Sequence, residues 1–409
     1  MPKYIYHMLS LIILISAFIP FLRHIHAYMP ALKDLLCIIL IFILVIKALN
    51  HFKNSRKISS TALLSLFCIL YFSLHIVSVA SLENIIEDFR FQVFYLILFS
   101  LLIVCYEKVD LKFIHFFSWT MFIACFFVLL ISIFEYYDQG IIFKIYGSYK
   151  EDMDNTRLSY GYRLISTMNN PINYAFFIIF LIPLSSFVFY KTKYHSLVYL
   201  FFTILVGLGV LLSYSRLAVI ALILVFAMYL MREVVRNTFL AIFTIALALI
   251  LSFSFVASFL SENITVIERT MQVISLDTYV QNSRVDNWLS GMGNLDNILY
   301  VLWGLGLGVA RPSGDDAIVV ENAFISIFIN FGLIGFIIYL YFFVMGFYNA
   351  FYVLKKHREH RYSFLFLSVF SVLFVMSTGN DINRNYPFSF IFWVFVYFSF
   401  SFRKLMDNK

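Results

Sequence analysis

The chain has 409 residues, of which 62% are hydrophobic and 20% aromatic, and only 13% carry a charge. An ordinary soluble protein carries about 25% charged residues. This composition excludes a soluble globular protein and is typical of a chain that crosses a membrane several times.

Apolar runs long enough to cross a hydrocarbon core recur along nearly the whole sequence. A helix needs about 20 residues to cross a core of roughly 30 Å, and these runs lack the alternation of barrel strands. We therefore predict an all-α integral membrane protein with about twelve transmembrane helices. The predicted spans cover residues 5–22, 32–50, 61–80, 89–106, 111–134, 172–190, 196–212, 217–231, 238–260, 332–354, 362–379 and 386–402.

The distribution of Lys and Arg predicts the orientation of these spans. If the N-terminus is cytoplasmic, eighteen of the 30 Lys and Arg residues lie on the cytoplasmic side, together with only five acidic residues. Both termini are then cytoplasmic, as an even number of spans requires. The net charge of +7 reflects this bias and does not indicate nucleic-acid binding. We expect a single polytopic domain over residues 1–409.

Two loops on the predicted outer side are longer than the rest, at residues 135–171 and 261–331. Arginine is the dominant cation on that side. Once Arg23 and Lys33 are set aside, the outer cations are two lysines, Lys144 and Lys150, and eight arginines, Arg90, Arg157, Arg163, Arg216, Arg269, Arg284, Arg311 and Arg384. Arginine binds phosphate through two parallel hydrogen bonds and stays charged when partly desolvated. The outer side is therefore suited to a phosphate-bearing ligand.

Two charged residues stand where long apolar runs begin. Arg216, in LLSYSRLAVIALI, is expected near the outer membrane boundary. There it would meet the phosphates of a lipid-linked substrate, or it would serve only as an anchor that reaches the headgroups. Glu321, in VVENAFISIFINF, is expected where the second long loop returns to the membrane. Its carboxylate would act as a general base, or it would only favour a helix N-terminus. Both alternatives stay open for each residue.

Four segments together resemble a known family. They are RLISTMNNPINYAFF at 163–177, SYSRLAVIAL at 213–222, SRVDNWLSGM and WGLGLGVA within 283–310, and ENAFISIFINFGLIGF at 321–336. In their order and predicted outer placement they resemble the O-antigen polymerase and O-antigen ligase group of bacterial polysaccharide enzymes. The resemblance covers roughly the second half of the chain. It implies a multi-pass glycosyltransferase of the bacterial inner membrane, with a periplasmic active site and a glycan donor on undecaprenyl diphosphate.

The acceptor distinguishes the members of this group. A polymerase extends another lipid-linked repeat unit, whereas a ligase transfers the glycan to the sugar core of lipid A. Ligases usually have a histidine where this sequence has Glu321 and Asn322, so the resemblance favours an O-antigen polymerase. A capsule repeat-unit polymerase has the same catalytic needs and remains an alternative, as does a ligase. The implied partners are the lipid-linked donor and acceptor, membrane lipid and a chain-length regulator protein, with no nucleic acid.

The resemblance and the chemistry of the leaving group together suggest roles for individual residues. Arg216 and Arg284 are expected to neutralise the charge that develops on the departing diphosphate. Glu321 is expected to deprotonate the attacking sugar hydroxyl. Substrate binding is expected at Arg157, Arg163, Asn170 and Arg311. No metal or other cofactor is expected, since the donor already carries an activated bond.

A different class of protein also fits twelve spans. A transporter, such as a flippase of lipid-linked oligosaccharides, stays open, and so does a non-catalytic scaffold of an envelope assembly complex. Transporters tend to hold charged residues in mid-span or in broken helices. In this sequence nearly all charged residues lie at predicted span ends and the long loops face outward, which favours an enzyme of the outer surface.

Overall fold

The structure, a computed structural model, describes residues 2–19, 22, 29–54, 60–138, 163–168, 170–193, 195–236, 283–311, 318–357, 360–385 and 387–407. In chain order the elements are α1 (Lys3–Ala17), α3 (Met29–Asn54), α4 (Ser60–Leu74), α5 (Leu82–Asp88), the π-helix η1 (Phe89–Val93), α6 (Phe94–Cys105), α7 (Leu111–Tyr137), the 3-10 helix η3 (Ser166–Met168), α10 (Pro171–Ile179), α11 (Leu181–Val188), α12 (His195–Leu212), α13 (Arg216–Arg236), α17 (Ser283–Gly293), α18 (Ile298–Trp303), β1 (Ala310–Arg311), β2 (Ile318–Val319), α19 (Ala323–His357), α20 (His360–Ser377), the 3-10 helix η4 (Ile382–Arg384) and α21 (Phe388–Asp407). The two short strands pair in parallel, and the other regular elements among the described residues are helical. The predicted helical class is thus confirmed.

Helices occupy eleven of the twelve predicted spans, and the remaining span, 238–260, lies outside the described residues. Within the described part, six helices are long and apolar enough to cross a membrane, and four further apolar helices are shorter. These helices indicate a multi-pass membrane protein. The count of twelve spans and the cytoplasmic position of both termini stay predictions.

One boundary differs clearly from the prediction. α19 begins at Ala323 rather than at 332, so residues 323–331, which we assigned to the second long loop, are helical. At Gly332 the backbone takes φ 63° and kinks the helix. Two further short helices, α17 and α18, lie in the described part of the same predicted loop.

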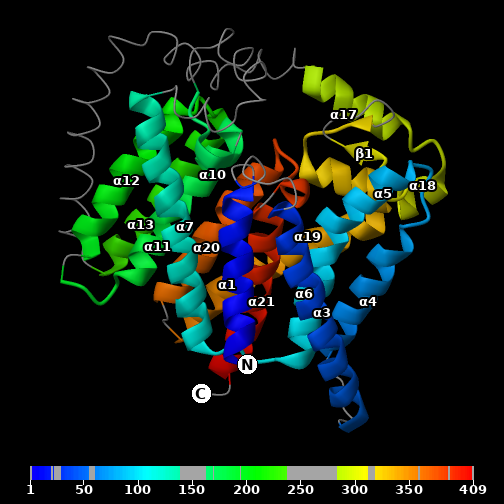
Figure 1. The fold of residues 1–409 in the computed structure, drawn as a ribbon, viewed down its shortest axis with the longest axis horizontal. Coiled ribbons are helices and arrows are strands. Elements are labelled where there is room, and N and C mark those ends of the chain that lie inside the picture. Colours follow the sequence, from blue (N-terminus) through cyan, green and yellow to red (C-terminus); the bar gives the residue numbers. More distant parts are fainter. Residues whose placement is uncertain are drawn as a thin grey trace.

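Both ends of the chain lie at the same end of the helix bundle (Figure 1). The Tyr6 hydroxyl of α1 donates to Asp110 Oδ2 over 3.1 Å, and Lys404 Nζ of α21 lies 3.6 Å from Glu107 Oε1 in the same turn before α7. We call this the terminal end and the opposite one the distal end. Since α7 runs from the terminal end to Tyr137, and α21 starts at the opposite end, the turn between α20 and α21 is distal.

The core forms around α21, which packs against α6, α19 and α20. Figure 1 shows α21 in the middle of the bundle, between α10–α13 on one side and α3–α6 with α18 on the other. Aromatic rings fill the contacts: the rings of Phe343 in α19 and Phe392 in α21 are 4.6 Å apart. Gly346 lets α19 and α20 approach, because a Cβ there would lie 2.5 Å from the Phe370 ring. Such close aromatic packing makes α21 a rigid base for the distal turn that precedes it.

Candidate functional site

The turn between α20 and α21 is a polar segment at the distal end. Residues 378–385, which we call the distal turn, read TGNDINRN between two apolar helices. The Asp381 side chain accepts from the Asn383 N–H over 3.1 Å and so caps η4 within the turn. Asp381 is fully buried, and this burial raises the pKa of its carboxyl group, against the opposing effect of Arg384 beside it. The distal turn is therefore a compact, charged structure and not a simple link.

A closed ring of three asparagine amides ties the distal turn to α10. Asn173 Nδ2 donates to Asn385 Oδ1 over 3.1 Å, Asn385 Nδ2 to Asn380 Oδ1 over 3.0 Å, and Asn380 Nδ2 to Asn173 Oδ1 over 3.0 Å. Each amide thus acts once as donor and once as acceptor within the ring. Because the ring joins residues on opposite sides of the distal turn to the first turn of α10, it fixes the position of both.

The start of α19 is bound to the same turn. Asn322 Oδ1 accepts from the N–H groups of Phe324 and Ile325, over 2.9 and 3.1 Å, as a helix N-cap. Its Nδ2 donates to the carbonyl oxygen of Thr378 over 2.8 Å. Glu321, which is half-buried, immediately precedes this cap. The predicted general base therefore lies beside the distal turn.

Arg216 lies at the first residue of α13, directly after a tight turn. In that turn Tyr214 has φ 54°, and Ser213 Oγ accepts from the N–H of Ser215 over 3.2 Å. The next residue, Leu217, packs on Gly379 of the distal turn, where a Cβ would overlap its Cδ1 atom. Arg216 and Glu321 were predicted from segments about one hundred residues apart, and both are adjacent to residues that contact the distal turn.

Arg163 belongs to the same region. Its Nε donates to the Ser213 carbonyl over 2.9 Å, and the N–H of Leu164 donates to the Leu212 carbonyl over 3.2 Å. The following backbone is held by the buried carboxylate of Glu135, which accepts from the N–H groups of Ile165 over 3.1 Å and Ser166 over 2.8 Å. Arg163 and Arg216 therefore flank the same turn at the distal ends of α12 and α13.

An apolar cavity of about 410 Å³ lies near this turn, between the distal halves of α7 and α12. Its lining ends at Leu164 and Leu212, next to Arg163 and Ser213 in the chain. The lining residues are Leu129, Ser132, Ile133, Tyr136, Tyr137, Leu164, Leu205, Leu208, Gly209, Leu211 and Leu212. A cavity of this composition accommodates a hydrocarbon chain, with arginine next to it for an anionic head group.

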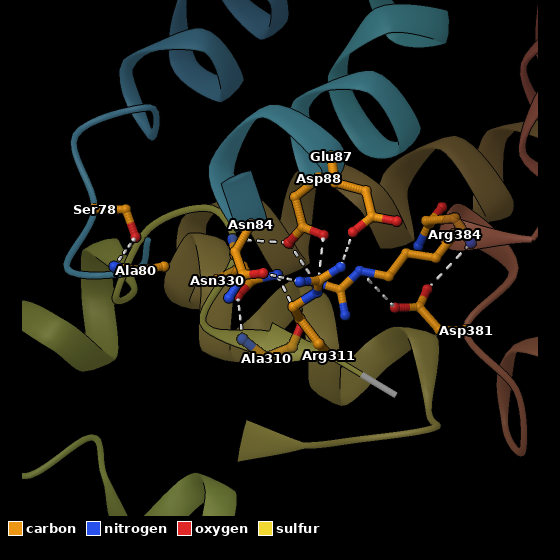
Figure 2. A network of polar contacts seen from close by, with 12 residues as sticks. Ser78, Ala80, Asn84, Glu87, Asp88, Ala310, Arg311, Asn330, Asp381 and Arg384 are labelled. Carbon is orange, nitrogen blue, oxygen red and sulfur yellow. Dashed lines mark hydrogen bonds and ion pairs between the residues drawn. The ribbon is translucent and has the colours of Figure 1, made fainter. Parts of the chain in front are cut away.

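The other predicted site residues have different surroundings. Asn170 is the N-cap of α10, and its Oδ1 accepts from the N–H groups of Ile172 and Asn173. Arg311 Nη1 and Nη2 donate to Asn84 Oδ1 and Glu87 Oε2 (Figure 2). The structure thus gives both residues a role in holding the fold. Arg284 lies in α17, but its side chain is outside the described part, as is the whole of Arg157.

A buried ion pair lies on the other side of the distal turn, where the guanidinium groups of Arg311 and Arg384 both approach Asp88 (Figure 2). Arg384 Nη2 donates to Asp88 Oδ2, which also accepts from the Gly308 N–H over 2.7 Å. The Arg384 Nε lies 3.8 Å from Asp381 Oδ2. Charges of opposite sign thus join three distant parts of the sequence, 84–88, 308–311 and 381–384.

Sequence reasoning missed the distal turn and the asparagine ring. The available signal was the concentration of three asparagines, one aspartate and one arginine within residues 380–385, between two apolar runs. Sequence reasoning did single out three segments that contact this turn, 163–177, 213–222 and 321–336, and a fourth, 283–310, whose Gly308 binds the Asp88 that pairs with Arg384. Among the residues that the structure describes, no cluster of His, Cys, Asp and Glu is suited to a metal ion.

The described part of the distal end therefore places Arg163, Arg216 and Glu321 near several amides and an adjoining apolar cavity. This set is suited to a ligand with an apolar tail, an anionic group and hydrogen-bonding hydroxyls. No protein-family model matches the sequence, and no curated protein matches it significantly.

Proposed function

We propose that this protein is an O-antigen polymerase, a glycosyltransferase that joins undecaprenyl-diphosphate-linked oligosaccharide repeat units on the periplasmic face of the bacterial inner membrane. The observation that carries the proposal is that three of the four segments that resemble the family contact the distal turn, and that the fourth is joined to it through Asp88. The apolar cavity beside Arg163 supports it, because a lipid-diphosphate donor needs an apolar site next to fixed cations. In this proposal the distal end is periplasmic.

The proposed reaction forms one glycosidic bond and breaks one bond to phosphate. A hydroxyl oxygen of the acceptor sugar attacks the anomeric carbon of the donor glycan. The bond from that carbon to the diphosphate oxygen breaks, and the diphosphate leaves with the electron pair. Arg216 and Arg284 stabilise the charge that develops there, Arg163 binds the substrate beside the same turn as Arg216, and Glu321 accepts the proton of the attacking hydroxyl. Because the lipid diphosphate is itself the leaving group, no nucleotide is consumed.

Filling the cavity is expected to weaken donor binding. Leu208 lines the cavity from α12, and Leu208→Trp introduces an indole into the space assigned to the polyprenyl chain. We expect KM for the lipid-linked donor to rise by about tenfold, because the lost apolar contacts contribute about 1.4 kcal/mol of binding free energy. The matched control is Leu197→Trp on the same helix, since Leu197 is 61% exposed on the bundle surface. Equal KM values for the two variants would show that the cavity does not bind the donor.

Glycolipids from a strain that lacks this gene, with the intact gene restored in parallel, test the proposed function. Lipid A cores that carry a single repeat unit, converted to a ladder on restoration, are expected for an O-antigen polymerase. Uncapped cores together with long glycan on undecaprenyl diphosphate would indicate a ligase instead. An unchanged ladder would reject both and leave a capsule polymerase or a transporter.

A further inference from the structure

The ion pair of Asp88 and Arg384 is buried to an unusual degree for two charges. Their side chains are 0% and 5% exposed, and they come from segments that are about 300 residues apart. Buried ion pairs add little net stability compared with apolar residues of the same size. Charged residues inside membrane proteins are rare and commonly serve function. The location of this pair therefore calls for a reason other than stability.

Asp88 is held in place independently of Arg384. It ends α5 and is followed at once by the π-helix η1, a rare wide turn that often occurs at functional positions. The Gly308 N–H donates to its Oδ2, and Arg311 Nε lies 4.0 Å from its Oδ1. Gly308 has φ 88°, and a Cβ there would lie 2.9 Å from the carbonyl carbon of Asn84, so only glycine brings this N–H to the carboxylate. The carboxylate is thus a fixed anchor.

Arg384 connects this anchor to the distal turn. Besides Asp88, its guanidinium lies near Asp381 of the same turn, with 3.8 Å between Nε and Oδ2. With the Gln92 amide turned so that its oxygen faces the guanidinium, that oxygen accepts from Nε over 3.1 Å and from Nη2 over 3.2 Å. Residues on α5 and η1 therefore hold the distal turn through one side chain (Figure 2).

The distal turn also contacts the starts of α13 and α19, next to the proposed active residues Arg216 and Glu321. Its Thr378 carbonyl accepts from Asn322, next to Glu321, and its Gly379 contacts Leu217, next to Arg216. We propose that Arg384, held by Asp88, is a positioning residue: it fixes the distal turn and thereby the separation of Arg216 and Glu321. The kinetic part of this inference rests on the proposed function, whereas its structural part does not.

The kinetic test compares Arg384→Gln, Asp88→Asn and the double variant in proteoliposomes supplied with lipid-diphosphate-linked repeat units. A displacement of about 1 Å at an active centre costs about 100-fold in rate, so we expect kcat to fall at least about tenfold in each single variant. KM for the donor is expected to stay within about twofold, since the apolar tail and its cavity are unchanged. The double variant should lose no more than a single one, because its two positions act as a unit.

The control variant is Arg361→Gln at the terminal end. Arg361 Nε and Nη2 donate to the Phe187 carbonyl over 3.0 and 2.7 Å, so this change also removes a partly buried guanidinium. Its kcat is expected to equal that of the wild type. If the single variants fail to fold, kcat is measured in the double variant, in which both side chains are neutral. A wild-type kcat in Arg384→Gln or in the double variant, or losses that multiply in the double variant, would overturn the proposal.

A cross-link measures the position of the turn without any substrate. Leu217→Cys and Gly379→Cys, in a background without the native cysteines, place two thiols where Leu217 contacts Gly379. We expect a disulfide to form readily with Arg384 present and severalfold less in Arg384→Gln and in the double variant. Equal cross-linking in all backgrounds would overturn the structural part. If the wild type extends no chain, the proposed function fails, and the cross-link still decides whether Arg384 positions the turn.

Discussion

Arg216→Lys is expected to lose chain extension as completely as Arg216→Ala, with a fall in rate of about 100-fold or more. The lysine keeps the charge but has no planar fork for two phosphate oxygens, and its ammonium is more strongly hydrated. The measurement is the rate of chain extension at equal amounts of folded protein in the membrane. The expected loss follows from the position of Arg216 at the distal end, one residue from the contact with Gly379.

The control for this prediction is Arg403→Lys. Arg403 lies at the terminal end, where its Nη1 donates to Asn349 Oδ1 over 3.1 Å, and the change is chemically the same. We expect this variant to extend chains at the wild-type rate. Full activity in Arg216→Lys would leave only the role of a boundary anchor for Arg216, because an anchor requires charge but not the guanidinium fork.

Gly304→Ala is expected to lower the free energy of unfolding by about 3 kcal/mol. Gly304 has φ 91°, and a Cβ there would lie 2.5 Å from the carbonyl oxygen of Asn330 and 2.5 Å from the nitrogen of Gly332. Both atoms belong to the kinked backbone of α19, so neither moves aside as a flexible side chain does. The substitution therefore adds both backbone strain and a steric overlap.

Thermal unfolding in detergent checks this prediction. The midpoint of Gly304→Ala should lie several degrees below that of the wild type. The matched control is Gly293→Ala at the end of α17, where a Cβ meets nothing within 4 Å and alanine favours the helix. We expect its midpoint to be unchanged or slightly higher. Equal midpoints for the two variants would contradict the packing of Gly304 on α19.

The helices were predictable from the sequence because a helix that crosses a membrane needs an apolar run of a certain length. Their ends were less predictable. α4 ends at Leu74, before the end of the predicted span 61–80, and α19 begins at Ala323. The cap at Asn322 was a usable signal for the second boundary, since an asparagine followed by an apolar run is typical of a helix start. The apolar residues that follow it were instead assigned to a loop.

The candidate site was predictable in its parts but not in its assembly. Arg216 and Glu321 stood out because a charge beside a long apolar run has few explanations. The partners of Arg311 were not predictable, because Glu87 and Asn84 lie more than 220 residues away in the sequence. The distal turn escaped notice for the same reason: its contacts with Asn173 and Asn322 are tertiary and leave no periodic pattern.

The most direct test of the proposed function is chain extension by the purified protein in proteoliposomes that contain only undecaprenyl-diphosphate-linked repeat units from a strain without the gene. We predict products that differ in length by whole repeat units, with release of free undecaprenyl diphosphate and with no nucleotide added. Movement of the lipid-linked repeat unit across the bilayer without any extension would contradict this account and would identify a transporter.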